Sequence, residues 1–121
     1  MDGATRNLRA GVIGVGSLGM NHARNYSAID GVELVCLHDI DRGRAEEAAK
    51  RFGGLVCSSI DDLLGHVDAV SVCTPATDHV EAVTAAMERG VHVLVEKPIA
   101  SSAAEGKKLV RLAAERGVCF Q

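Results

Sequence analysis

The stretch "GVIGVGSLGMNHA" (Gly11–Ala23) places glycines at positions 14, 16 and 19, the spacing of a tight connection between a strand and a helix. The apolar run "LRAGVIG" (residues 8–14) leads into it, and "SLGMNHARNYSAID" (residues 17–30) follows with the composition of a helix. A second apolar run, "VELVCLHD" (residues 32–39), ends in Asp39, twenty positions after the third glycine. Glycines, flanking elements and acid in this order are typical of a turn that binds the pyrophosphate group of a dinucleotide.

Each residue of this turn has a predicted role. Gly14 permits the tight turn, Gly16 lets a pyrophosphate approach the backbone because it has no Cβ, and Gly19 lets the helix pack closely on the sheet. Ser17 and Leu18 lie at the predicted helix N-terminus, where free N–H groups and the positive end of the helix dipole attract phosphate. Two other interpretations stay open: a glycine-rich turn that binds nothing, and the first turn of an S-adenosylmethionine-dependent methyltransferase.

The residues after the second strand bear on the choice of dinucleotide. Asp39 can accept hydrogen bonds from the hydroxyls of an adenine ribose, and Ile40 beside it belongs to the same predicted site. A carboxylate there repels a 2′-phosphate, so the sequence favours NAD over NADP. Arg42 and Arg44 follow closely, and they either pair with a 2′-phosphate or form a solvated helix start, so NADP stays possible.

Strand-like and helix-like segments alternate along the whole chain, which indicates a parallel sheet covered by helices on both sides. The predicted strands cover residues 8–14, 32–39, 55–58, 67–74 and 91–96, and a sixth begins at residue 118. The predicted helices cover residues 17–30, 41–52, 59–64 and 102–116, and another ends at Gly90. The 121 residues therefore predict one α/β domain over residues 1–121, a Rossmann-type doubly wound parallel sheet of about six strands.

Composition excludes several classes of protein. The net charge of −3 without a basic block, and an aromatic content of 2%, give no surface for nucleic acid. The apolar runs are too short to span a membrane, and the N-terminus lacks the pattern of a secretion signal. All four cysteines stand in or beside apolar runs without metal-ligand spacing, so we expect buried thiols in a reducing cytoplasm, no disulfide and no metal: Cys36, Cys57, Cys73 and Cys119.

The segment "VEKPIA" (residues 95–100) places Glu96 and Lys97 directly after a strand-like apolar run. Thr74 and Pro75 follow the preceding strand in the same way, and ligands of open parallel sheets bind beyond the carboxyl ends of strands. A partly buried lysine there can act as the acid/base group when hydride leaves a substrate carbon, with Glu96 bonded to a ribose hydroxyl or holding the lysine. The alternative is a surface ion pair at a strand end, which contributes little.

The whole pattern resembles the N-terminal cofactor domain of the glucose–fructose oxidoreductase / inositol dehydrogenase (Gfo/Idh/MocA) family. The matching pieces are "GVIGVGSLGMNHARNY", "CLHDIDRGRAEEAAKRFG" and "DAVSVCTPATDHVEAVTAAMERGVHVLVEKPIA", and they extend the resemblance from about Leu8 to Gln121. The resemblance implies that Lys97 is catalytic, that Glu96 lies near the nicotinamide ribose, and that Thr74, Pro75 and His79 line the cofactor. Within the family, the chain looks most like the branch that acts on nucleotide-linked amino sugars.

The resemblance also implies a second α+β domain that builds the substrate pocket, and this chain ends before it. The expected function is the cofactor domain of an NAD(P)-dependent oxidoreductase acting on a secondary alcohol of a sugar, nucleotide-sugar or cyclitol, inactive by itself and able to self-associate. A non-catalytic dinucleotide-binding or redox-sensing module is the alternative. Of the other histidines, His22 either approaches the cofactor or packs, and we expect structural roles for His38, His66 and His92.

Overall fold

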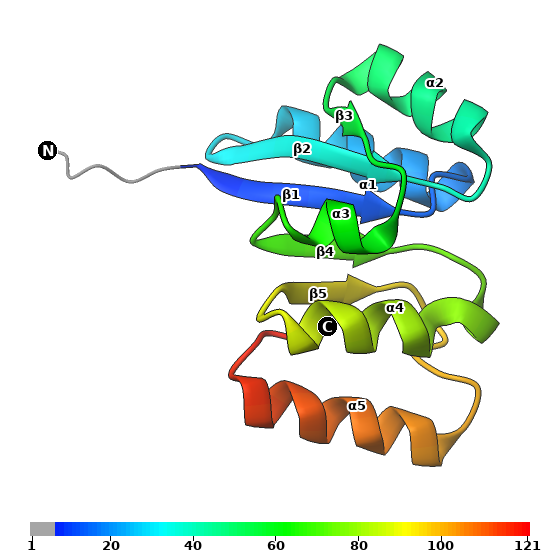
Figure 1. The fold of residues 1–121 in the computed structure, drawn as a ribbon, viewed down its shortest axis with the longest axis vertical. Helices are drawn as coiled ribbons and strands as arrows, with labels where there is room; N and C mark the ends of the chain where they lie inside the picture. The colour runs from blue at the N-terminus through cyan, green and yellow to red at the C-terminus, as the bar shows by residue number, and fades with distance from the viewer. Residues whose placement is uncertain (1–6) are drawn as a thin grey trace, which may run out of the picture.

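Five parallel strands form one sheet, and helices cover both of its faces (Figure 1). This computed structural model describes residues 7–121, without the side chains of Ala76 and Thr77. The strands are β1 (Leu8–Ile13), β2 (Val32–His38), β3 (Leu55–Val56), β4 (Ala69–Val72) and β5 (His92–Val95). The helices are α1 (Ser17–Ala28), α2 (Arg42–Phe52), α3 (Ile60–Leu64), α4 (Ala76–Glu88) and α5 (Ala103–Arg116).

The strand order is β3-β2-β1-β4-β5, so the chain leaves β1 toward β2 and later returns to the other side of β1 with β4. This reversal is the switch point at which doubly wound sheets bind ligands, beyond the carboxyl ends of their strands. In Figure 1 the carboxyl ends point to the right, where the connections into α1, α2 and α4 begin. The predicted Rossmann-type architecture is confirmed.

The core has two parts because side chains alternate between the two faces of each strand. On β1, Val12 is buried with residues of α1 and α2, whereas Ile13 is buried with residues of α3, α4 and α5. On β4, Val70 and Val72 are buried on the same side as Ile13, with α3, α4 and α5, and Ser71 between them faces α1. Ser71 is thus a buried polar group on the α1 side of β4.

Helix starts are set by short polar side chains that accept a hydrogen bond from the first turn. Asp41 accepts from the amide of Gly43, Ser59 from that of Asp62 and Ser102 from that of Glu105. Helix α1 differs, because its N-cap is Gly16, which has no side chain to cap it. Its first amides are left for another acceptor.

The sixth strand predicted from residue 118 is reduced to a single bridge between Val93 and Phe120. The amide of Val95 donates to Gln121 O and the amide of Gln121 donates to Val93 O, so the segment starts to extend the sheet beside β5. The described sheet therefore has five strands and this bridge.

The cysteines follow the prediction only in part. Cys36 and Cys57 are buried, Cys73 is half-buried, and all four are unpaired. Cys119 is exposed, so its predicted burial is wrong. It lies after α5 beside β5, where its amide donates to His92 Nδ1 and its carbonyl accepts from the amide of Val93.

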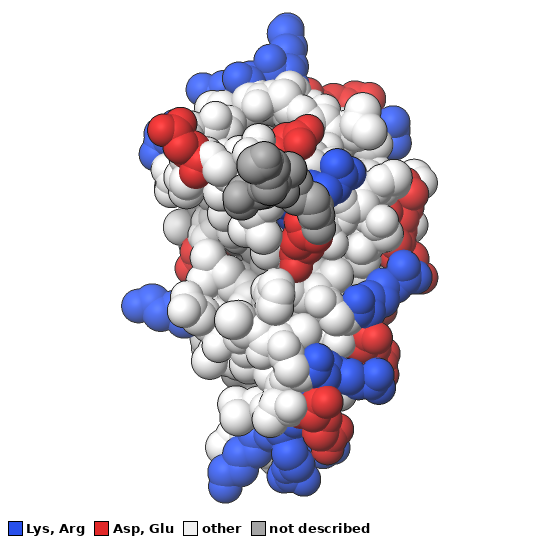
Figure 2. All heavy atoms as spheres, turned by 90° about the vertical axis from the view of Figure 1, so that its left-hand side faces the viewer, with Lys and Arg blue, Asp and Glu red and all other residues white. Residues whose placement is uncertain are grey.

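Figure 2 looks onto the face of the molecule where the strands begin. Figure 2 shows basic and acidic side chains interspersed around a largely uncharged centre on that face. Within residues 7–121, no helix has both the length and the apolar character needed to cross a bilayer. Residues 1–6, on which part of the prediction about a secretion signal rests, lie outside the described part of the chain.

Candidate functional site

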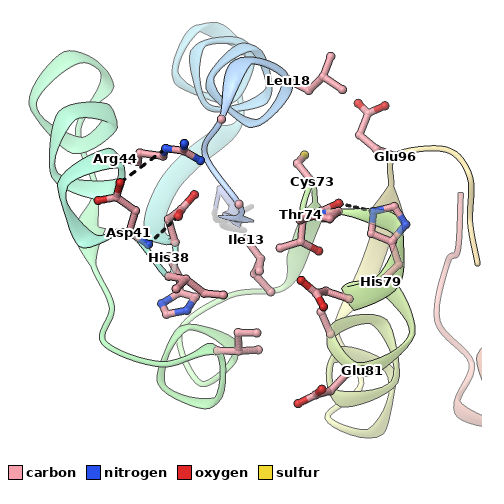
Figure 3. A pocket seen from close by; sticks show the side chains of 18 of the residues that line it. Ile13, Leu18, His38, Asp41, Arg44, Cys73, Thr74, His79, Glu81 and Glu96 are labelled. Atoms are coloured by element: carbon pink, nitrogen blue, oxygen red, sulfur yellow. Dashed lines mark hydrogen bonds and ion pairs between the residues drawn. The ribbon is translucent and has the colours of Figure 1, made fainter.

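A cleft of ≈ 790 Å³ opens at the switch point, between the glycine turn after β1 and the turns after β4 and β5 (Figure 3). A volume of this size is ordinary for a site that holds a small molecule or cofactor. All the predicted site residues except Ser17 and Gly19 line it: Gly14, Gly16, Leu18, Asp39, Ile40, Arg44, Thr74, Pro75, His79, Glu96 and Lys97. The structure thus brings together residues that are up to 83 positions apart, counted from Gly14 to Lys97.

Two glycines of the turn are required by the protein's own packing. Gly14 has φ +89, and a Cβ there would lie 2.8 Å from the backbone nitrogen of Thr74. A Cβ on Gly19 would overlap the carbonyl oxygen of Gly14. The predicted roles of these two glycines, a tight turn and close helix packing, match these contacts.

Gly16 is different, because nothing in the protein demands a glycine there. Its φ is −72, which any residue can adopt, and a Cβ would meet no atom within 4 Å. Gly16 lines the cleft, so this open space is part of the candidate site. The absence of a Cβ at this position allows a ligand to approach the backbone closely.

The N-terminus of α1 faces the same space. Its first turn contains no acidic residue, and no side chain caps it. Free amides and the positive end of the dipole of a 12-residue helix therefore stay available to an anion. Gly16 and the first turn of α1 together fit the requirements of a diphosphate-binding site.

Asp39 joins the glycine turn to the end of β2. Its Oδ2 accepts from the amide of Val15 at 2.9 Å, and its Oδ1 accepts from the amide of Asp41 at 2.8 Å. Each carboxylate oxygen has a second lone pair, so Asp39 can still accept from ribose hydroxyls. Arg44 Nε lies 3.8 Å from Asp41 Oδ2, which partly neutralises this guanidinium at the rim.

On the opposite wall, Glu96 is bonded to His22 and not to Lys97. His22 Nε2 donates to Glu96 Oε2 at 2.6 Å, across 74 positions of sequence. Sequence reasoning left open whether Glu96 holds the lysine or meets a ribose, and it gave His22 no partner. Lys97 lines the cleft beside this pair, and it is exposed, so the partial burial expected of it is wrong for this structure.

His79 was predicted to line the cofactor, and the structure places it beneath the cleft wall, only 1% exposed. Its Nδ1 is 2.7 Å from Pro98 O and its Nε2 is 2.6 Å from Thr74 O. The two oxygens are backbone carbonyls of the turns after β5 and β4, and because carbonyls only accept, a neutral ring with its single N–H donates to one of them. His79 joins these two turns, and its polar atoms are taken up by the protein.

Sequence reasoning missed a chain of polar groups behind Glu96. His22 Nδ1 is 2.8 Å from Ser71 Oγ, and Tyr26 OH is 2.5 Å from the same oxygen. The available signal was His22 and Tyr26 four residues apart on one helix face, on either side of the buried Ala23. Serine, histidine and glutamate stand here in the order of a hydrolase triad, but Ser71 is 0% exposed and cannot reach a substrate.

Cys73 lies next to this group. Burial, and to a lesser extent the charge of Glu96, raises the pKa of the Cys73 thiol to about 12. Among the described residues, His22, Cys73 and Glu96 are the one group whose metal-ligating atoms lie within 4.8 Å of one another. A thiol that keeps its proton is a poor metal ligand. The close approach of the other two groups is explained by the hydrogen bond between His22 and Glu96.

Comparisons with known proteins agree with this geometry. The model of a family described as "Oxidoreductase family, NAD-binding Rossmann fold" matches residues 8–121. The UDP-N-acetylglucosamine 3-dehydrogenase of Acidithiobacillus ferrooxidans is 42% identical over 110 residues, which are 91% of this chain and 34% of that protein. The scyllo-inositol 2-dehydrogenase (NAD(+)) of Bacillus subtilis is 35% identical over 120 residues, covering 94% of this chain and 34% of that protein.

Solved structures show the same likeness. GenD2 from gentamicin A biosynthesis, in complex with NAD, superposes with a TM-score of 0.92 at 34% identity, covering 95% of this chain and 34% of that one. The A. ferrooxidans dehydrogenase superposes with a TM-score of 0.89 at 40% identity, covering 94% of this chain and 36% of that one. The chain spans about a third of the length of the curated relatives it matches.

Proposed function

The chain belongs to the Gfo/Idh/MocA oxidoreductase family, whose model is described as an NAD-binding Rossmann fold, and on this premise we propose that it is the cofactor domain of an NAD-dependent dehydrogenase. The reaction is hydride transfer between the nicotinamide and a secondary alcohol of a sugar, cyclitol or nucleotide-sugar. The relatives named for UDP-N-acetylglucosamine and scyllo-inositol support this substrate class. Residues 1–121 act as one dinucleotide-binding domain in this proposal, in a cytoplasmic protein.

One observation carries the proposal. Gly16 lacks a side chain although neither its backbone conformation nor its packing requires that, and it borders the cleft at the N-terminus of α1. A diphosphate placed there accepts from the free amides of the first turn, which include those near Ser17 and Leu18.

The rim after β2 supports NAD as the dinucleotide. Asp39 is fixed by the amides of Val15 and Asp41, so its carboxylate cannot swing away from an incoming ribose. A 2′-phosphate would meet this negative charge at close range. Ile40 is 92% exposed beside it and offers an apolar surface to the adenine end.

The wall formed by Thr74, Pro75, Glu96 and Lys97 receives the nicotinamide end. Thr74 lines the cleft, and its buried Oγ1 has no hydrogen-bond partner among the described residues. Bound NAD supplies the hydride acceptor. In oxidation, Lys97 as the free amine would take up the proton of the substrate hydroxyl, and in reduction its ammonium would return that proton to the carbonyl oxygen. Glu96 would hold a ribose hydroxyl with the oxygen that His22 leaves free.

Two alanine variants test cofactor binding with the same added methyl group. Gly16→Ala places a Cβ in the cleft, whereas Gly106→Ala places one in α5, outside the cleft lining, where a Cβ also meets no atom within 4 Å. Calorimetric titration with NAD should show at least about a tenfold weaker affinity for Gly16→Ala and an unchanged affinity for Gly106→Ala. Equal affinity of both variants and the unmodified chain, or no NAD binding by the unmodified chain, would refute the proposed function.

A further inference from the structure

The turn that carries Lys97 is held from both sides. Glu96, before the lysine, is bonded through its carboxylate to His22 of α1. Pro98, after the lysine, is bonded through its carbonyl to His79 of α4. The Glu96 amide also donates to Val72 O at 3.0 Å, which ties the start of the turn to β4.

The contacts behind Glu96 form a chain with one consistent direction. A carboxylate oxygen only accepts, so Nε2 of His22 carries the hydrogen in its 2.6 Å contact with Glu96. Nδ1 then accepts from the Ser71 hydroxyl, and Ser71 Oγ accepts from the Tyr26 hydroxyl. Each polar group in the chain is satisfied, which fixes both the ring orientation and the tautomer of His22.

The far end of this chain is anchored in the rigid part of the fold. Ser71 is 0% exposed in the middle of β4, between β1 and β5. Burial raises the pKa of the Tyr26 hydroxyl, so this hydroxyl remains a donor. The position of the Glu96 carboxylate is therefore determined by a strand at the centre of the sheet and by the helix that begins at the glycine turn.

We propose that His22 is a positioning residue. Its ring is anchored by the Ser71 hydroxyl, which is itself bonded to the Tyr26 hydroxyl, and it holds the Glu96 carboxylate by a hydrogen bond. This contact fixes the turn that presents Lys97 to the cleft. This role rests on the proposed function, in which Lys97 is the acid/base group. His22 does not touch the reacting atoms. It sets where Glu96 and its neighbour lie before any ligand arrives.

The test uses two substitutions that separate the ring's two contacts. The amide nitrogen of glutamine reaches about as far as Nε2, so His22→Gln keeps a donor for Glu96, whereas the shorter His22→Asn keeps only a group near Ser71. Amide hydrogen exchange of Glu96 reports on the turn, and exchange of Gly14, whose amide donates to His38 O, reports on the opposite wall. His66→Gln serves as the control, since His66 is half-exposed and its side chain pairs with Asp62 on α3.

We expect His22→Asn to speed exchange at Glu96 about tenfold, because a hydrogen bond to a charged group is lost, and to leave Gly14 within about twofold. His22→Gln should stay within about threefold of the unmodified chain at both amides, and His66→Gln should change neither. The proposal is overturned if the asparagine and glutamine variants behave alike, or if Gly14 accelerates as much as Glu96, which would indicate a general packing role. NAD titration of the unmodified chain is read separately: absence of binding there overturns the proposed function while the exchange comparison still reports on His22.

Discussion

The two walls of the cleft are built in different ways. The glycine turn, residues 14–19, owes its shape to side chains that are missing: one glycine for its φ, one for helix packing and one for the open space in front of it. The lysine turn, residues 96–98, owes its position to side chains that are present, above all two histidines from α1 and α4. One wall is defined by the backbone, and the other by a network of polar contacts.

This difference determines how each wall responds to change. An added methyl group at Gly14 or Gly19 meets backbone atoms that cannot move aside, so its cost falls on the fold, whereas one at Gly16 enters only the open cleft. A substitution on the lysine turn removes a contact at the surface of the cleft, so its cost falls on the chemistry. The following predictions test that distinction.

Gly19→Ala should have the largest effect, because the new Cβ would overlap the carbonyl oxygen of Gly14. We expect the free energy of unfolding, measured with urea, to fall by about 3 kcal/mol or more. Gly106→Ala is the matched control, and it should raise the free energy of unfolding by up to about 1 kcal/mol, since alanine favours a helix interior. Similar free energies of unfolding for the two variants would contradict the claim that the glycine wall depends on missing side chains for its fold.

Lys97→Ala should leave the fold intact and remove the chemistry. In the intact gene product we expect the rate of hydride transfer to fall by about 10²- to 10⁴-fold, the usual range for losing an acid/base group. The affinity for NAD should change by less than about threefold, and Lys107→Ala on the exposed side of α5 should affect neither quantity. A variant that retains its turnover would show that Lys97 is not the acid/base group, whereas an intact gene product without turnover would leave the dinucleotide-binding module as the better description.

Asp39→Asn should have an intermediate effect on both the fold and binding, because Asp39 belongs to the glycine wall through its side chain. The amide group of asparagine offers one acceptor where two backbone amides donate, so we expect a loss of about 1–2 kcal/mol of stability. Calorimetry should show about tenfold weaker NAD binding and a smaller preference for NAD over NADP. Asp61→Asn, which alters only an exposed pair with Arg89, should change stability by less than about 0.5 kcal/mol.

The smallest effect concerns the thiols. Burial raises the pKa of Cys57 and Cys73 from 9.0 to about 12 in the folded chain. Below pH 9.0 both thiols are protonated in both states, but above it the unfolded chain releases protons that the folded chain retains, so stability falls as the pH rises toward about 12.

Urea midpoints measured between pH 8 and 10.5 should show this loss, and it should be shallower in Cys73→Ser. The exposed Cys119 provides the control, since Cys119→Ser should leave the slope unchanged. A slope that stays the same in the Cys73 variant would mean that this thiol is not protected by the fold.

The sequence determined the sheet, the glycine turn and the residues at the carboxyl ends of the strands, because these features follow from local patterns: apolar runs, helix-capping residues and glycine spacing. Asp39, Thr74 and Lys97 could be placed at one edge because parallel strands all end there. Only the tertiary structure decided which of these residues touch. The partners of Glu96 and the two carbonyls that engage His79 lie between 5 and 74 positions away in the sequence, and no local pattern relates them. Their distances depend on how α1 and α4 pack on the two faces of the sheet, which is a property of the assembled core.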